Sequence, residues 1–293
     1  MKKTISFIIN PLSGGKSKEY IPQLIKSTID AEKYDFDIQI THNENDTLQK
    51  ASRAVENKFD AIVAVGGDGT LNNVGQFIKH TDILLGIVPM GSGNGFAREL
   101  GISMDVTKSL QTINKWHHKT VDTGIINDNF FINLTGVGFD AHVTGLFARS
   151  QSRGLKTYAR ITLSEFMNYK SHDYSIFCDG VQMVHNAFLM SVCNGSQFGN
   201  NACIAPGARL DDGYFDVSVV EKFKLWQTPE MGLRLFNKTI DKMSFVTSYK
   251  AKEIKIIREK EDMVNIDGEP VMMGNELTIK NQPKSIKVIV PNE

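Results

Sequence analysis

Residues 63–70 read Val-Ala-Val-Gly-Gly-Asp-Gly-Thr, an apolar strand that runs directly into a glycine-rich turn. Glycine can adopt positive φ and leaves backbone N–H groups accessible, so the three glycines of this turn are typical of a loop that handles phosphate. A helix expected from Leu71 onward adds an N-terminus that favours negative charge. Asp68 would repel a phosphate, and we therefore expect it to order Mg²⁺, a metal-bound water or a neighbouring donor.

Apolar runs alternate with amphipathic stretches through the first third of the chain, which predicts a βαβαβ arrangement. These segments are residues 5–9, 20–29, 36–40, 48–55 and 61–65, and a further strand over 83–88 precedes a helix over 96–100. In an open α/β sheet, ligands bind at the carboxyl ends of the strands. The loops expected there are residues 10–15, 41–42, 66–70 and 91–94, which together could form one nucleotide site.

From about His118 the pattern changes to short alternating segments, which are typical of an antiparallel, β-rich second domain. Strands are expected over 130–134, 174–178, 188–192, 215–220, 254–257 and 285–290, and helices over 155–169 and 226–238. No linker rich in glycine, serine or proline marks the change. We expect domains at 1–118 and 119–293, an arrangement in which the C-terminal strand can return to the first domain.

Composition narrows the class of protein. The 293 residues hold 33 Lys and Arg and 33 Asp and Glu, which argues against a nucleic-acid binder that works through bulk positive charge. The three cysteines form no CxxC pair, which argues against a disulfide framework or a zinc site and favours a reducing compartment. The apolar run 5–9 is too short for a signal peptide or a membrane span, so we expect a cytoplasmic protein.

Three common nucleotide-binding motifs do not fit. Residues 15–17 supply the end of a Walker A loop, but Asn10 stands where its first glycine belongs. Neither residues 67–69 nor residues 91–93 continue to the third glycine of a dinucleotide fingerprint. The chain also has no His-Arg-Asp and no Asp-Phe-Gly, which a protein kinase needs.

The chain resembles, over nearly its whole length, the catalytic domain shared by diacylglycerol kinases, sphingosine kinases and bacterial soluble lipid kinases. Residues 10–15, 66–70 and 89–94 are similar to the family's nucleotide loops. Gly-Gly-Asp-Gly also occurs in NAD kinases, so the deciding matches are residues 210–217, which resemble the family's second-domain metal segment, and 266–270, which resemble its late catalytic turn. The resemblance implies an NAD-kinase-like, three-layer, Rossmann-like α/β N-terminal domain and a β-rich antiparallel sandwich behind it.

The reaction that the resemblance implies is transfer of the γ-phosphoryl group of ATP to a lipid hydroxyl in the presence of Mg²⁺. The residues implied around ATP are Asn10, Pro11, Ser13, Gly14, Thr41, Gly66, Gly67, Asp68, Gly69, Thr70, Asn72, Gly91, Ser92, Gly93 and Asn94. The implied metal residues are Arg209, Asp212 and Tyr214, with Asp122 in the same magnesium network. Asp267 or Glu269 would be the general base, with Asp267 preferred, and Asp68 completes the catalytic set.

Several of these residues also have an ordinary structural interpretation. Asp122 could cap a turn, and Asp-Gly at 212–213 and at 267–268 is a common hairpin dipeptide. The interpretation of both dipeptides as functional therefore rests on the resemblance. The neighbouring histidines 117 and 118 have no acidic or cysteine partner at ligand spacing, which favours solvated side chains over a metal site.

The sequence indicates the identity of the acceptor lipid less closely than that of the phosphoryl donor. Ser92 and Gly95 stand where soluble bacterial relatives often have threonine and aspartate, and the Ser-Gly-Asn form resembles sphingosine kinases. Diacylglycerol is the first expectation, giving phosphatidic acid for phospholipid biosynthesis, before a sphingoid base, ceramide or another glycerolipid. An NAD kinase and a catalytically silent nucleotide- or lipid-binding regulator are the alternatives from other classes.

A lipid substrate implies contact with a membrane surface. Arg149, Arg153, Lys156 and Arg160, with apolar residues among them, could dock transiently on an anionic bilayer. The alternative is a helix packed on the second domain with its charges solvated. A homodimer is implied by the resemblance alone.

Overall fold

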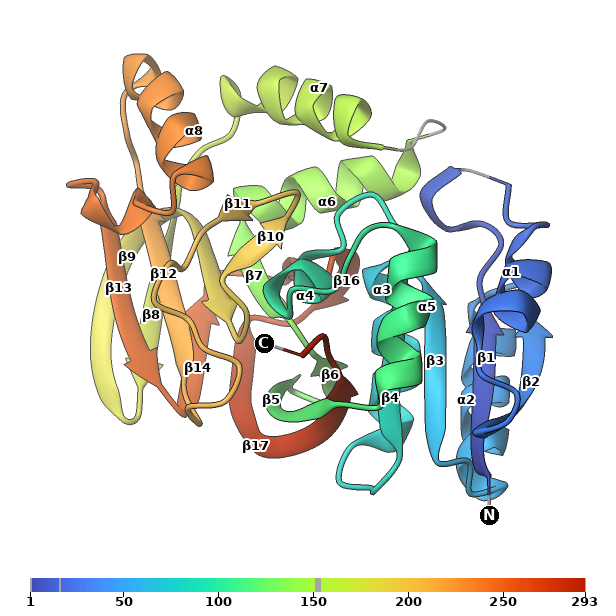
Figure 1. Cartoon of the computed structure of the whole chain (residues 1–293). Coiled ribbons are helices and arrows are strands. Elements are labelled where there is room, and N and C mark those ends of the chain that lie inside the picture. The colour runs from blue at the N-terminus through green and yellow to red at the C-terminus, as the bar shows by residue number, and fades with distance from the viewer. Residues whose placement is uncertain (1, 16, 151–153, 293) are drawn as a thin grey trace. The chain divides into compact units, whose positions relative to one another are not determined.

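A computed structural model describes residues 2–15, 17–150 and 154–292, and the chain divides into two units. Unit 1 comprises Met1–Val121 and Lys284–Glu293, and unit 2 comprises Asp122–Pro283. The chain passes from the first unit to the second within strand β5 (His118–Ile126) and returns within β17 (Glu276–Ile289) (Figure 1). Two residues of the patterns discussed above, Lys16 and Arg153, lie outside the described residues.

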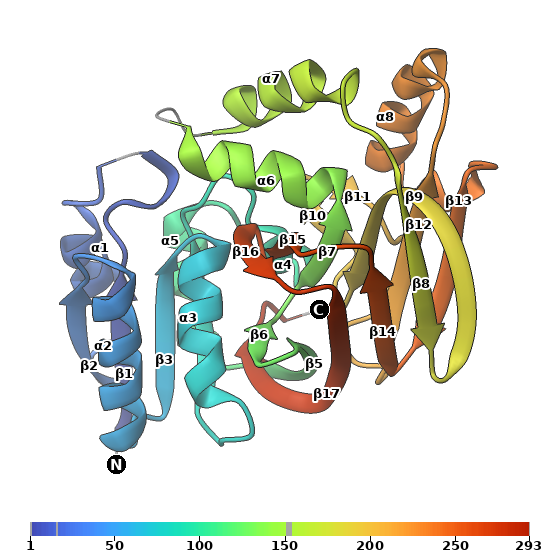
Figure 2. The ribbon, with the colours of Figure 1, turned by 180° about the vertical axis from the view of Figure 1, so that it is seen from behind.

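Unit 1 is built on a parallel sheet in the order β17-β4-β3-β1-β2. Its remaining strands are β1 (Lys3–Ile9), β2 (Tyr34–Ile40), β3 (Ala61–Gly66) and β4 (Leu84–Pro89). Its helices are α1 (Ile21–Thr28), α2 (Glu44–Glu56), α3 (Asp68–Ile78), α4 (Gly95–Glu99) and α5 (Val106–Lys115), with a 3₁₀ turn η1 (Ser13–Gly15). Figures 1 and 2 show α1 and α5 on one face of the sheet and α2 and α3 on the other.

The sequence explains this layering. Every residue of β3 and β4 is buried, as expected of parallel strands that are covered on both faces. Asn43 caps α2 by accepting a hydrogen bond from Asp46 N, and Asp105 caps α5 through Lys108 N. Ile21 and Ile25 of α1 pack with Leu110 and Ile113 of α5 on the strands.

Unit 2 is an antiparallel, β-rich body in which the long strand β9 (Val181–Cys193) plays the central part. The first half of β9 pairs with β8, and its second half pairs with β7 on one side and β12 on the other. The other strands are β6 (Asn129–Phe131), β7 (Leu134–Gly138), β8 (His172–Cys178), β10 (Gln197–Gly199), β11 (Ala202–Cys203), β12 (Phe215–Glu221), β13 (Val246–Ala251), β14 (Glu253–Arg258), β15 (Asp262–Ile266) and β16 (Glu269–Met273). The helical elements are α6 (Phe139–Arg149), α7 (Leu155–Phe166), α8 (Thr228–Phe236) and the 3₁₀ turns η2 (Leu225–Gln227) and η3 (Ile240–Lys242).

The expected combination of an α/β part and an antiparallel β-rich part is confirmed, although two expected strands differ in detail. The segment 130–134 is two strands, because the N–H groups of Ile132 and Asn133 bond to the side chain of Asp267 and interrupt the ladder. The segment 285–290, expected among the antiparallel strands of the second part, returns to unit 1, as the expected domain arrangement allowed, and pairs in parallel with β4, with Lys287 opposite Leu84. Among the described helices, none has both the length and the apolar character that a bilayer crossing requires.

Candidate active site

Three loops meet at the carboxyl edge of the unit 1 sheet, as the sequence predicts. Asn10, which follows β1, donates its main-chain N–H to Val65 O at 3.0 Å and its Nδ2 to Thr70 Oγ1 at 3.0 Å. Met90, which follows β4, donates its N–H to Gly66 O at 2.7 Å. Thr41 follows β2 and donates its N–H to Ile9 O at 2.8 Å. The loops 10–15, 66–70 and 90–94 are therefore held together by direct hydrogen bonds.

The loop 10–15 is also closed by its own polar groups. Asn10 Oδ1 accepts from Leu12 N at 3.0 Å, and Ser13 Oγ donates to Asn10 O at 3.1 Å. The buried Lys18 ammonium donates to Pro11 O at 3.1 Å and to Ser13 O, and burial lowers the pKa of this lysine. These bonds fix the loop in one shape beside the other two.

Gly66, Gly67 and Gly69 could each adopt positive φ, but none of the three does so. Glycine is required for another reason, namely the close approach of the loops. A Cβ on Gly66 would lie 2.4 Å from Thr70 Oγ1, and a Cβ on Gly91 would lie 2.5 Å from Gly67 Cα. Positive φ occurs instead at Gly14, where a Cβ would lie 2.0 Å from Met90 O. A side chain at Gly14 or Gly91 would force the loops apart, and one at Gly66 would collide with Thr70 in the same turn.

Helix α3 begins at Asp68, three residues before the expected start at Leu71. Its N-cap is Gly67, which offers no side chain to bond to the first N–H groups of the helix. The start of a helix without a side-chain cap presents these donors, and the positive end of its dipole, to an anion. The structure thus gives the 66–70 turn the features that phosphate binding needs.

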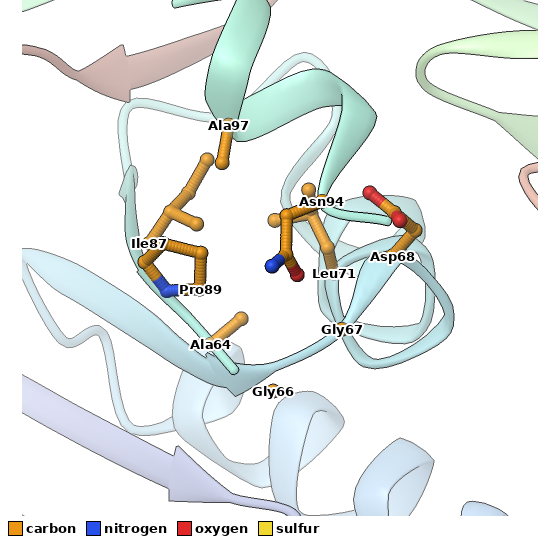
Figure 3. Close-up of a pocket in the computed structure, with 9 residues that line it drawn as sticks. All are labelled: Ala64, Gly66, Gly67, Asp68, Leu71, Ile87, Pro89, Asn94 and Ala97. Carbon is orange, nitrogen blue, oxygen red and sulfur yellow. The ribbon is translucent and has the colours of Figure 1, made fainter. Parts of the chain in front are cut away.

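A small pocket opens among these loops (Figure 3). Its lining residues are Ala64, Gly66, Gly67, Asp68, Leu71, Ile87, Pro89, Asn94 and Ala97. The Asn94 side chain accepts from Gly91 N at 2.9 Å through Oδ1 and donates to Gly91 O at 2.9 Å through Nδ2. Asn94 has a φ of 51°, a left-handed conformation that asparagine tolerates better than most residues. Its side chain therefore shapes the 91–94 loop.

In unit 2, Asp122 lies against the segment 210–214. Its buried carboxylate accepts from Gly213 N at 2.7 Å, and its own N–H donates to Leu210 O at 2.6 Å. Asn194 Nδ2 donates to Asp122 O and to Ile132 O, each at 2.7 Å. The structure therefore brings Asp122 together with the residues that the sequence predicts as metal ligands.

Asp212 lies between a main-chain donor and a lysine. Its Oδ1 accepts from Tyr214 N at 3.1 Å, and its Oδ2 lies 2.7 Å from Lys250 Nζ. Lys250 Nζ also lies 3.5 Å from Asp216 Oδ2, a buried oxygen that makes no hydrogen bond. Burial raises the pKa of Asp216, and the hydrogen bond that Lys250 donates to Asp212 raises the pKa of Lys250.

The donor set of this segment suits a hard cation such as Mg²⁺, which prefers carboxylate and main-chain oxygens. The carboxylates of Asp212 and Asp216 share the single ammonium of Lys250, so this group of side chains has a surplus of negative charge. The Arg209 side chain points to Asp211, with Nε 3.5 Å from Asp211 Oδ1, which leaves its main-chain oxygen as the predicted ligand. Among the described residues, no group of three His, Cys, Asp or Glu side chains is arranged to hold a metal.

The two carboxylates of the 266–270 turn have different surroundings. Asp267 is buried, and its carboxylate accepts from Ile132 N at 2.7 Å, Asn133 N at 2.9 Å and Leu134 N at 3.0 Å. These three main-chain donors hold the carboxylate in one place. Glu269 is exposed at the start of β16. The geometry therefore gives Asp267 the features of an anchor and leaves Glu269 accessible.

Sequence reasoning missed a buried polar chain behind this turn. Asn265 Oδ1 accepts from Gly268 N at 2.8 Å, and Asn265 Nδ2 donates to Asp140 Oδ2 at 2.7 Å. Asp140 is buried, and its burial raises its pKa to about 6, although hydrogen bonds with Asn265 and Tyr158 oppose the rise. Asn265 stands three residues before Gly268, a spacing at which an asparagine side chain often closes a local turn. The sequence therefore did contain a signal for the hydrogen bond between these two residues.

Comparison with known proteins gives matches for both parts of the chain. A family described as "Diacylglycerol kinase catalytic domain" matches residues 4–126, and "YegS C-terminal NAD kinase beta sandwich-like domain" matches residues 133–290. A protein of Staphylococcus aureus (strain MRSA252) named diacylglycerol kinase is 31% identical over 304 residues, covering 100% of this chain and 94% of the relative. Its namesake in Staphylococcus saprophyticus is 30% identical, covering 100% of this chain and 97% of that protein.

Solved structures agree with the fold. A crystal structure described as a diacylglycerol kinase from Bacillus anthracis str. Sterne has a TM-score of 0.74 at 23% identity, covering 99% of this chain and 97% of that one. Another structure from the same organism reaches a TM-score of 0.80 at 24% identity, with the same coverage. At this identity the likeness establishes the shared fold.

Proposed function

We propose that this chain, which belongs to the diacylglycerol kinase family of lipid kinases, transfers the γ-phosphoryl group of ATP to the free hydroxyl of diacylglycerol. The observation that carries the proposal is the meeting of loops 10–15, 66–70 and 90–94 at one edge of the unit 1 sheet. Their glycines leave space only for backbone, and α3 presents its first N–H groups there. Phosphoryl transfer depends mainly on positioning and charge neutralisation, which such an edge supplies.

On the acceptor side, Glu269 takes the proton of the lipid hydroxyl. Its exposure supports this role, because a base must come within hydrogen-bond reach of its substrate. Asp267 anchors the turn through its three main-chain hydrogen bonds. Asp68, at the first position of α3, has the place from which a carboxylate can order the cation that accompanies ATP.

Two further parts of the proposal concern Mg²⁺. One ion accompanies ATP, where it neutralises the phosphates. A second is held by the Asp212 carboxylate with main-chain oxygens of Arg209 and Tyr214, and Asp122 fixes this segment through Gly213. The second ion is structural, and the surplus negative charge of Asp212 and Asp216 supports it.

The partners follow from the substrate. Diacylglycerol resides in a bilayer, so the protein makes transient contact with a membrane surface. Homodimer formation stays a prediction of the family resemblance.

The acceptor is tested by a substrate panel in mixed micelles with labelled ATP and Mg²⁺. The panel contains diacylglycerol, sphingosine, ceramide and monoacylglycerol, with NAD as a water-soluble control. The proposal expects labelled phosphatidic acid as the main product. Preferential labelling of another lipid would retain the lipid kinase and change its substrate, and labelling of NAD would contradict the proposal.

A further inference from the structure

Helices α7 and α8 carry apolar side chains on two opposite faces, whereas a surface helix normally has one. On the inward face, Tyr158, Ile161 and Phe166 of α7 and Met231 and Leu235 of α8 pack against the core of unit 2. On the outward face, Leu163, Met167, Trp226, Leu233 and Phe236 are between 61% and 70% exposed. Packing of the core does not explain this second apolar face.

The outward residues form continuous stripes. Trp226 lies in η2 directly before α8, and Pro229, Leu233 and Phe236 follow at steps of three, four and three residues, which keeps them on one side of the helix. On α7 the exposed residues Lys156, Arg160 and Leu163 follow at steps of four and three, and Met167, the C-cap of the helix, follows four residues later. Both views show α7 and α8 on the same side of the unit 2 strands (Figures 1 and 2).

Positive charge flanks both stripes. Residues 154–170 and 222–238 together contain seven Lys and Arg against two Glu, in a chain whose total charge is zero. Both glutamates have partners, since Glu165 lies 2.9 Å from His142 and Glu230 lies 2.8 Å from Arg234. The exposed lysines 222, 224 and 238 lie beside the Trp226 stripe. We call the exposed residues of 154–170 and 222–238 the α7–α8 face.

We propose that the α7–α8 face docks on a membrane that contains anionic lipids. Trp226, Leu233 and Phe236 enter the headgroup region, where tryptophan is favoured, and the flanking lysines bind the anionic headgroups. The inference rests on the proposed function, because it assigns the surface through which a kinase of a bilayer lipid reaches its substrate. Two copies of this positive face would repel each other, which disfavours a self-associated pair as its occupant.

Vesicle sedimentation tests the face directly. The full chain is mixed with vesicles of phosphatidylcholine alone or with phosphatidylglycerol, and the bound fraction is measured. We expect binding that requires phosphatidylglycerol and weakens with salt. The double substitution Leu233→Asp with Phe236→Asp should weaken binding by roughly tenfold or more, because two apolar side chains no longer leave water.

Val184 provides a matched control for this substitution. It lies on β9, outside the residues of the α7–α8 face, and is 66% exposed, as against 65% for Leu233. Val184→Asp should therefore bind vesicles like the wild type. Thermal melting curves first establish that each variant is folded. The proposal would be overturned if the Leu233/Phe236 variant bound vesicles as well as the wild type. It would also be overturned if Val184→Asp lost as much vesicle binding as the Leu233/Phe236 variant.

Tryptophan fluorescence reports insertion at one residue. The chain has two tryptophans, and Trp116 is stacked on Tyr34 in unit 1. Anionic vesicles should shift the emission to shorter wavelength in the wild type and leave the Trp226→Phe variant unchanged. A shift that persists in Trp226→Phe would place the docking surface elsewhere.

A short-chain, water-soluble diacylglycerol separates this proposal from the proposed function. The Leu233/Phe236 variant should phosphorylate that substrate at the wild-type rate and lose activity only on vesicles. Wild-type protein that binds vesicles through Trp226 and phosphorylates no lipid would contradict the proposed function alone. Light scattering measures the oligomeric state of the wild type and of the Leu233/Phe236 variant. If a change in oligomeric state accounted for the loss of vesicle binding, the docking proposal would be overturned in favour of a self-association surface.

Discussion

Asp267 and Glu269 are two residues apart, but their surroundings give them different tasks. Asp267 is buried under three main-chain N–H groups, and Glu269 is exposed on the same turn. Sequence alone preferred Asp267 as the base, because an Asp-Gly turn does not reveal which carboxylate the chain folds over. The difference between the two carboxylates is set by residues 132–134, whose N–H groups cover Asp267. These residues are more than 130 positions away, and no local pattern connects them to this turn.

Glu269→Gln should lower kcat by roughly 10²–10⁴-fold, because the amide cannot accept the proton of the lipid hydroxyl. We expect the KM for ATP and the melting temperature to stay near wild type, since Glu269 is exposed. Steady-state kinetics in diacylglycerol micelles provide the measurement. Near-wild-type turnover in this variant would remove Glu269 from the role of base.

Asp267→Asn should act mainly on stability. The asparagine oxygen can still accept from Asn133 and Leu134, but its amide group would face Ile132 N–H, so one buried donor loses its partner. We expect a loss of about 3 kcal/mol in the free energy of unfolding, measured by urea denaturation. Unchanged stability together with lost turnover would instead make Asp267 a catalytic group.

Lys250 allows a test of the second magnesium ion. Lys250→Met removes the ammonium that Asp212 and Asp216 share, so their uncompensated charge should attract a cation more strongly. We expect Mg²⁺ to raise the melting temperature of Lys250→Met by more than that of the wild type. The absence of any response to Mg²⁺ in both proteins would remove the metal from this segment.

At the scale of elements, the loops of unit 1 could be predicted because each one follows a buried strand of a parallel sheet. The sequence could not predict why these loops need glycine, because the need arises from close contacts between one loop and another. Gly67 and Gly91 are 24 positions apart, yet a Cβ on either would meet the backbone of the other. Similarly, the break between β6 and β7 depends on a side chain in a distant turn.

Gly91→Ala should separate the loops, because its Cβ would lie 2.5 Å from Gly67 Cα. We expect a higher KM for ATP and lower kcat/KM, with the far-UV circular dichroism of the sheet retained. Gly232→Ala is the control, because a Cβ on Gly232 has no neighbour within 4 Å and alanine favours a helix. Equal ATP KM in Gly91→Ala and wild type would contradict the proposed nucleotide edge.

The buried chain from Asp140 to Gly268 predicts a pH dependence of stability. The pKa of Asp140 rises from 3.8 in the unfolded chain to about 6 in the fold, so the folded protein binds this proton more tightly. Its stabilising contribution is complete below pH 3.8 and is lost as the pH rises through 6, by about 3 kcal/mol in total.

Asp140→Asn cannot titrate, so the difference between the two stability curves isolates this group. We expect the wild type to lose about 2 kcal/mol of its free energy of unfolding relative to the variant between pH 4 and pH 7, which is most of the total, measured by urea unfolding. Parallel curves over this range would show that Asp140 has an ordinary pKa.

At the scale of the whole molecule, the change in periodicity near His118 was enough to predict an α/β part followed by a β-rich part. The return of the chain was harder to locate, because residues 285–290 alternate like an antiparallel strand but pair in parallel with β4. Pairing between segments two hundred residues apart is set by the sheet, which local patterning does not contain. The basic residues of α7 were visible in the sequence, whereas the neutral total charge gave no sign of the lysines beside α8.

The central claim is that ATP turnover by this chain is coupled to formation of a lipid phosphate. The most direct measurement follows wild-type protein with ATP, Mg²⁺ and sn-1,2-diacylglycerol in micelles by phosphorus NMR, which resolves ADP, free phosphate and phosphatidic acid together. We predict one phosphatidic acid for each ADP, with no free phosphate. Formation of ADP with free phosphate and without phosphatidic acid would contradict the account.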